Sequence, residues 1–366
     1  YSAAMSALNE LVRRSELVRS GVMTAAEDAA ADHKRADINI HVAAFLRSLQ
    51  ARDCTANHVA SVKRRLETVL HECKFRTLRA VAREPLERWL TSDSNLKRSA
   101  RTRNTYVIAV KSFCAWAVET ERLVSNPLKR IALADDHADR RRQPRALSET
   151  ELVALFDAAR RRPLVEARKF NRGWRKGANG AHLRSATVAR LERLGWERSL
   201  AYRVLALTGL RLGELASIRV CDLNLDAPRA TLLLQARHAK NRQGATIVLR
   251  ADLATELRQW ITTGEGASDR PLFRVSHSLL HVFNRDIKFA GIAKRDERGR
   301  TVCIHSLRHS FATMLNRHGV APRVAQAAMR HSTISLTMQT YTDPRLLDVA
   351  AAVEALPALL RPLALS

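Results

Sequence analysis

Hydrophobic residues recur at helical spacing through much of the chain. From residue 38 onward, apolar side chains three and four positions apart predict four helices. They lie near residues 42–49, 59–70, 86–90 and 106–118. The connections between them are short, so residues 38–131 are predicted to form a small helical bundle.

The segments on either side of this bundle have different patterns. Residues 1–37 mix short apolar groups with charges, which predicts helices with an exposed face and a docking role. Residues 132–145 lack apolar periodicity and are interpreted as an inter-domain linker. Ser148 and Glu151 then form a helix-opening capping pattern at the start of a second domain, residues 146–366.

The second domain is predicted to be mostly helical with one small antiparallel β-hairpin. Two strand-like runs, residues 231–236 and 245–249, are joined by a turn that contains Asn241 and Gly244. Strands are few and helical periods dominate both domains. The predicted fold class is therefore mainly α.

Residues 305–341 form a series of short predicted helices. Leu307, Phe311 and Met314 share one face of a helix over residues 306–318, and Gly319 suits a left-handed C-cap. Pro322 can occupy the first position of the next helix, which is expected to run to about Met329, with His331 at its end.

A third short segment follows, opened by Ser332 or Ser335, and it carries Tyr341. Asp343 and Pro344 are expected to begin a last helix, whose apolar stripe includes Leu346 and Leu356. We expect that helix to pack either on its own domain or on a neighbouring copy.

Charge and cysteine content change the picture. The chain has 62 Lys plus Arg against 36 Asp plus Glu, a formal charge of +26, with 46% hydrophobic residues. A folded chain with this excess is expected to bind a polyanion. The 5 cysteines are scattered, which favours reduced thiols and a cytoplasmic location. No apolar run is long enough for a membrane span or a secretory signal.

Several polar residues stand out against this helical background. His305 and Arg308 are three residues apart, so they share a helix face and can point at one anion. Arg211 is surrounded by leucines in a predicted apolar helix and requires a partner, for which an ion pair with Glu214 is the simplest alternative. Lys240 follows the first strand, where a lysine is ordinarily solvent-exposed.

These residues, taken in order, resemble the tyrosine recombinase family, the phage-integrase type of site-specific DNA strand exchangers. The resemblance covers roughly residues 38–360. Thr208 to Leu215 match the T-G-L-R-x-x-E-L box, and a lysine in a β-hairpin and an H-x-x-R box follow. It implies six catalytic residues: Arg211, Lys240, His305, Arg308, His331 and Tyr341.

Two features depart from the family pattern. Arg330 precedes His331 where the family most often has glycine, and Tyr341 follows His331 by ten residues rather than nine. The extra residue leaves open the local path of the tyrosine segment. It also leaves open whether Tyr341 acts in its own active site or in that of a neighbour.

The residue types suit phosphodiester transesterification. Tyr341 can attack phosphorus, although its unperturbed pKa near 10 requires a base or a positive potential. Arg211 and Arg308 match phosphate oxygens, and Lys240 can protonate the leaving 5′ oxygen. His305 can act as a base or phosphate donor and His331 as a neutral donor. With these cations, we expect no metal ion and no other cofactor.

Basic residues elsewhere are candidates for phosphate contacts. The resemblance implies that residues 38–131 are a core-binding DNA domain and 146–366 the catalytic domain. Residues 160–198 hold 12 Lys plus Arg against 3 Glu, and their core, residues 169–180, is interpreted as a basic insertion against DNA. A solvated charged face is the alternative for each. The candidates are Lys63, Arg64, Arg65, Arg101, Arg103, Lys169, Arg172, Arg175 and Lys176.

The resemblance also implies how the protein works. We expect cleavage of double-stranded DNA at inverted-repeat sites through a 3′-phosphotyrosine and a Holliday junction, by a homo-oligomer, most simply a tetramer. A type IB topoisomerase would share the chemistry but relax supercoils. A DNA-binding regulator of the same fold without catalysis is the alternative from another class of protein.

Overall fold

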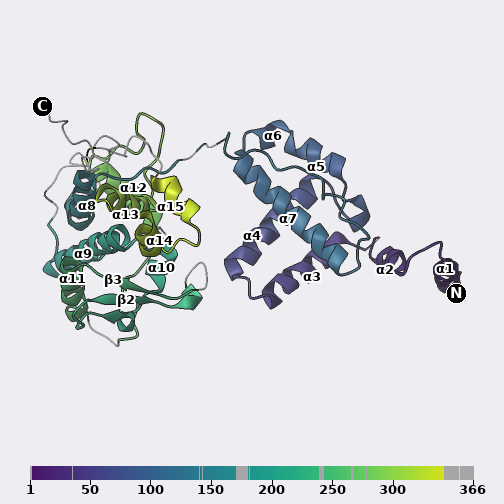
Figure 1. Cartoon of the computed structure of the whole chain (residues 1–366), viewed down its shortest axis with the longest axis horizontal. Helices are drawn as coiled ribbons and strands as arrows, with labels where there is room; N and C mark the ends of the chain where they lie inside the picture. Colours follow the sequence, from purple (N-terminus) through teal and green to yellow (C-terminus); the bar gives the residue numbers. More distant parts are fainter. Residues whose placement is uncertain are drawn as a thin grey trace, which may run out of the picture. The chain divides into compact units, whose positions relative to one another are not determined.

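The computed structural model describes most of the chain. The described residues are 2–34, 36–139, 141, 143–169, 180, 182–238, 243–264, 268–276, 278–341 and 354. The chain divides into two compact units, residues 1–141 and 142–366 (Figure 1).

Unit 1 is an all-helical bundle with its own core. Apolar side chains such as Phe45, Leu66 and Phe113 are fully buried in it. Its helices are α1 (Ser2–Arg19), α2 (Ala25–Lys34), α3 (Ile38–Ala51), α4 (Ala56–Glu72), α5 (Arg83–Leu90), α6 (Asp93–Leu96) and α7 (Ala100–Glu119), with a 3₁₀ turn η1 (Leu78–Ala80).

Local sequence signals account for these helices. Asp37 begins α3 by accepting a hydrogen bond from the Asn39 N–H at 2.7 Å. Thr55 and Ser99 cap α4 and α7 in the same way, because a short polar side chain satisfies an N–H group that the first turn leaves without a partner. The four helices predicted from apolar spacing correspond to α3, α4, α5 and α7.

Unit 2 is also mostly helical. The long helix α9 runs through its core, where α8, α11 and α13 pack against it, and α13, α14 and α15 lie together (Figure 1). The helices are α8 (Glu149–Ala167), α9 (Ser185–Thr208), α10 (Leu212–Ser217), α11 (Ala251–Thr262), α12 (Leu279–Phe289), α13 (Ser306–Arg317), α14 (Pro322–Met329) and α15 (Ile334–Tyr341).

The start of unit 2 follows the predicted capping pattern. Ser148 accepts from the Glu151 N–H, and the Glu151 carboxylate accepts from the Ser148 N–H, so α8 opens with a complete capping box. The predicted last helix, apart from Glu354, lies outside the described residues.

A three-stranded antiparallel sheet completes the unit, with strand order β1 (Leu223–Asn224), β2 (Thr231–Leu234) and β3 (Ala245–Val248). Thr231 pairs with Val248 and Leu234 with Ala245, which confirms the predicted hairpin. The predicted boundary at residue 236 is wrong, because the chain leaves the sheet after Leu234 and enters a 3₁₀ turn, η3 (Ala236–His238). A further 3₁₀ turn in the described part of this unit is η2 (Val220–Asp222).

Two further properties concern the described part of the chain. None of its helices is long and apolar enough to cross a membrane. Its five cysteines are all free, and Cys114 is fully buried in the core of unit 1, where burial raises the pKa of the thiol to about 12.

Candidate active site

The site begins where α9 ends. Gly209 has φ +62° and terminates the helix in the left-handed conformation, with its N–H bonded to the Leu205 carbonyl. The chain then continues in extended conformation through Arg211, which occupies the N-cap of α10. Arg211 therefore does not lie inside a helix as predicted, because the positive φ of Gly209 interrupts the apolar stretch just before it.

Arg211 is paired with Glu214, the alternative considered from sequence. The Arg211 N–H donates to Oε2 at 2.9 Å, and its Nη1 donates to Oε1 at 2.7 Å. Burial raises the Glu214 pKa, but the hydrogen bonds and charges of nearby arginines outweigh burial and lower it. Nε and Nη2 of Arg211 have no hydrogen-bond partner among the described residues, and the side chain is 29% exposed. The ion pair thus leaves one edge of the guanidinium available.

Arg308 joins three elements. It lies in the first turn of α13 and is only 3% exposed. Its Nη1 donates to the Gly209 carbonyl at the end of α9, and its Nη2 donates to the Met329 carbonyl at the end of α14. Burial, followed by the charges of nearby arginines, lowers the Arg308 pKa to about 9, so the group remains charged at neutral pH.

His331 follows the end of α14. The helix ends at Met329, as predicted, and Arg330 after it adopts the left-handed conformation with φ 52° and ψ 44°. The ring Nδ1 of His331 lies 2.9 Å from Oγ1 of Thr337 on α15. Burial and then the charges of Arg308 and other arginines lower the His331 pKa to about 4. The ring is therefore neutral at neutral pH.

His305 lies at the N-cap of α13, where it was predicted, and is exposed. Its ring meets the ring of His309 edge to face, with centroids 5.0 Å apart. Burial, His305 and Arg308 together lower the His309 pKa to about 4. His309 was not predicted, although its position four residues after His305 on one helix face was an available signal.

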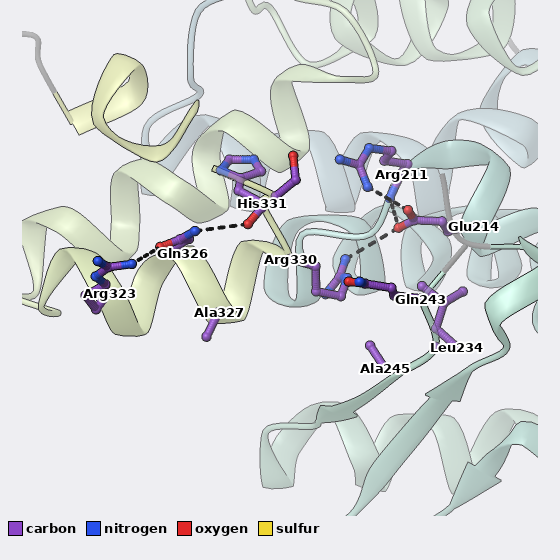
Figure 2. A pocket seen from close by; sticks show the side chains of 12 residues that line it. Arg211, Glu214, Leu234, Gln243, Ala245, Arg323, Gln326, Ala327, Arg330 and His331 are labelled. Carbon is purple, nitrogen blue, oxygen red and sulfur yellow. Dashed lines mark hydrogen bonds and ion pairs between the residues drawn. The ribbon is translucent and has the colours of Figure 1, made fainter. Parts of the chain in front are cut away.

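A cavity of about 490 Å³ lies between the start of α10, the β2–β3 hairpin, and α14 with the residues just after it. Figure 2 shows Arg211 and Glu214 on one side, Arg330 and His331 on another, and the hairpin below. Three guanidinium groups share one carboxylate: Arg211 and Arg330 are paired with Glu214, whose charge also acts on Arg308. Their excess of positive charge suits a phosphate.

The remaining predicted catalytic residues are only partly described. Lys240 lies outside the described residues, although Leu234 before it and Gly244 after it line the cavity. Tyr341 is the last residue of α15, which packs on α13 and α14, and its side chain lies outside the described part. The structure thus brings Arg211, Arg308 and His331 together.

The predicted DNA contacts lie in different places. Lys63 and Arg64 are exposed on α4 and Arg65 is half-buried, while on α7 Arg101 is exposed and Arg103 is half-buried. Lys169 is half-buried just after α8. The other predicted residues of the basic insertion lie outside the described part, namely Arg172, Arg175 and Lys176. No cluster of three or more His, Cys, Asp or Glu that could hold a metal ion occurs among the residues that were placed.

Replacement of Gly209 by alanine is expected to destabilise the site. A Cβ atom at Gly209 would lie 2.5 Å from the Phe311 ring, and φ is +62°. The backbone strain and the overlap should lower the free energy of unfolding by about 2–4 kcal/mol, measured by urea denaturation.

Gly319 provides the matched control. It has φ +69° but no atom within 4 Å of its Cβ position, so Gly319→Ala should cost only the backbone strain, about 1 kcal/mol. Equal losses for the two variants would contradict the proposed close packing of Gly209 against Phe311.

Comparison with known proteins agrees with this geometry. Residues 183–346 match the profile of the Phage integrase family. Tyrosine recombinase XerC of Mycobacterium sp. (strain KMS) is 27% identical over 268 residues, covering 70% of this chain and 76% of the relative. Tyrosine recombinase XerA of Saccharolobus solfataricus is 25% identical over 276 residues, covering 72% and 75%.

Solved structures show the same fold. A lambda integrase dimer bound to a COC′ core site has a TM-score of 0.62 at 15% identity, covering 93% of this chain and 87% of the other. XerH bound to a palindromic difH substrate has a TM-score of 0.55 at 19% identity, covering 83% and 82%. Residues 183–346 therefore form a phage-integrase family domain, in a chain that is similar to tyrosine recombinases over 70% of its length.

Proposed function

We propose that this recombinase cuts and rejoins duplex DNA at specific sites through a covalent 3′-phosphotyrosine at Tyr341. The observation that carries the proposal is the convergence of Arg211, Arg308 and His331 on one electropositive site. These residues come from the α9–α10 junction, from α13 and from the end of α14. Such a site can bind a phosphodiester and stabilise the charge that grows on it.

The proposed reaction is a transesterification. The Tyr341 oxygen forms a bond to phosphorus while the bond from phosphorus to the 5′ oxygen breaks, and a second 5′ hydroxyl later reverses the step. The free edge of Arg211 would neutralise the non-bridging oxygens, and neutral His331 would donate a hydrogen bond to one of them. Lys240 would protonate the leaving oxygen, and His305 would accept the tyrosine proton.

Arg308 has a more constrained position. Its two Nη atoms donate to the Gly209 and Met329 carbonyls, so in the DNA-free protein it holds the ends of α9 and α14 together. Its charge lies close enough to help lower the His331 pKa. We infer that it contributes positive potential at the phosphate and rigidity to the site, and that DNA binding redirects one of its N–H groups.

The domains would act together on DNA. Residues 38–131 would form a core-binding domain, the linker at 132–145 would tether it to the catalytic domain, and residues 1–37 would dock on a partner surface. The +26 charge supports DNA as the substrate. Inverted repeats are supported by similar solved structures that hold a core site or a palindromic difH site. We propose a tetramer on two such sites and a Holliday junction intermediate.

The proposal is tested with a nicked duplex that carries a recombination site. Loss of the short fragment beyond the nick traps the covalent complex, which should survive SDS, and peptide mapping should place the DNA on Tyr341. Inverted repeats in the DNA flanking the gene supply candidate sites. An adduct with no strand exchange between two sites would indicate a DNA-relaxing enzyme instead, and binding without an adduct would indicate a regulator.

Affinity for DNA is expected to fall steeply with salt, since phosphate contacts release counterions. Deletion of residues 169–180 removes Lys169, Arg172, Arg175 and Lys176. The slope of log affinity against log salt should then become less negative by up to about 3.5. A loop of the same length that keeps these four charges but changes the other residues should keep the original slope. If the deletion leaves the slope unchanged, the basic insertion is a solvated loop.

A further inference from the structure

Arg330 occupies an unusual backbone position at the edge of the site. It has φ 52° and ψ 44°, a conformation that favours glycine, and it forms the C-cap of α14. The side chain is nevertheless 12% exposed and directed inward. An arginine kept in a strained conformation calls for a reason in its side-chain contacts.

The guanidinium of Arg330 contacts three elements. Nη1 donates to the carbonyls of Thr208 and Ala328, each at 3.2 Å. Nη2 donates to the Gly209 carbonyl at 3.2 Å and faces Oε2 of Glu214 at 3.5 Å. These contacts connect the end of α9, the end of α14 and the first turn of α10.

Glu214 is therefore held from two sides, as the dashed lines of Figure 2 show. Nη1 of Arg211 approaches Oε1, while Arg330 approaches Oε2. Loss of Arg330 would leave Arg211 as the one ion-pair partner of this carboxylate among the described residues, with Arg308 acting on it only through its charge. Arg211 would then be drawn further onto Glu214 and away from the cavity.

The same contacts argue against a direct role at the phosphate. Each Nη atom carries two hydrogens, and these four Nη hydrogens of Arg330 are matched by four acceptors. Its Nε is buried and has no partner among the described residues. Arg330 can therefore act on the substrate mainly through the residues that it holds.

We propose that Arg330 is a positioning residue: by clamping Glu214 to the carbonyl ends of α9 and α14, it keeps the free edge of Arg211 and the ring of His331 directed into one cavity. The inference rests on the proposed function, since it assigns that cavity to the scissile phosphate. It also gives a reason for arginine at a position where glycine would be unstrained.

The first test compares variants in single-turnover cleavage of the nicked duplex. Arg330→Gly keeps the backbone conformation and removes the guanidinium, and it should slow cleavage about 30-fold while DNA affinity changes less than about threefold. Arg330→Lys keeps a cation that can reach Glu214 and should recover the rate to within about fivefold of the parent. Arg317→Gln removes an exposed charge at the end of α13 and should leave the rate unchanged.

The second test asks whether Arg330 acts through Glu214. Glu214→Gln and Arg330→Gly should be strongly non-additive, so that the double variant is no slower than the slower single variant. Multiplied effects in the double variant would overturn the proposal, and so would an unchanged cleavage rate in Arg330→Gly.

A third measurement does not depend on activity. In the DNA-free protein, the ¹⁵N–¹H signal of the Arg211 Nε should move in Arg330→Gly and return toward its parent position in Arg330→Lys. If the parent forms no adduct but the signal moves, the clamp is present and the proposed function fails. If the Arg211 Nε signal stays in place in both variants, the clamp itself is refuted. If Arg330→Gly does not fold, the Arg211 Nε signal and the cleavage rate of Arg330→Lys are compared with those of the parent instead.

Discussion

Replacement of Tyr341 by phenylalanine is expected to abolish the covalent protein–DNA adduct while leaving DNA affinity within about twofold of the parent. The hydroxyl is the proposed nucleophile, so its removal should lower the cleavage rate by at least about 10⁴-fold. Affinity should persist because it depends on many phosphate contacts rather than on one hydroxyl.

The measurement is an SDS gel of the trapped complex on a nicked duplex, beside a binding titration of the same variant. Tyr106→Phe is the matched control, since it removes the hydroxyl of a tyrosine on α7 of unit 1 and should form adduct at the parent rate. An adduct that persists in Tyr341→Phe would remove Tyr341 from the mechanism.

Substitution of Lys240 by alanine is expected to slow cleavage of ordinary DNA about 10²–10⁴-fold, the range for loss of a general acid. Its proposed role is confined to protonating the leaving 5′ oxygen. In a substrate with sulfur at this bridging position, the leaving group is a far better anion and hardly requires a proton. Lys240→Ala should then cleave the sulfur substrate at close to the parent rate.

Arg308→Ala provides the contrast. Its charge is proposed to act on the non-bridging oxygens, and its N–H groups hold the ends of α9 and α14, so sulfur should not restore its rate. If Lys240→Ala cleaves the sulfur substrate as slowly as it cleaves ordinary DNA, Lys240 is not the general acid.

Local elements were predictable because their signals are short in range. Ser148 and Glu151 indicate the start of α8, because they form a capping box within four residues. Pro322 opens α14, and two strand-like runs joined by a turn predict the β2–β3 hairpin. The order of the candidate catalytic residues could be predicted for the same reason, since each lies in a short pattern that resembles the family.

The structure differs from the prediction where the backbone conformation depends on contacts between residues far apart in the sequence. Arg211 lies outside a helix because Gly209 ends α9, and the close approach of Phe311 to Gly209 leaves no room for a side chain there. Similarly, no local pattern predicts the left-handed conformation of Arg330 after α14, which its long-range contacts stabilise.

The sequence by itself determined the helical character of both units, the hairpin and the basic charge, since these follow from periodicity, capping and composition. The candidate catalytic residues follow from its resemblance to the tyrosine recombinases. Only the tertiary structure decided which of them meet. Arg308 binds a carbonyl 99 residues away, and Arg330 reaches a carboxylate 116 residues away. Hydrogen bonds and charges act over a few ångströms in space, so no spacing along the chain reveals that Glu214 is shared or that His331 is held neutral by burial among arginines.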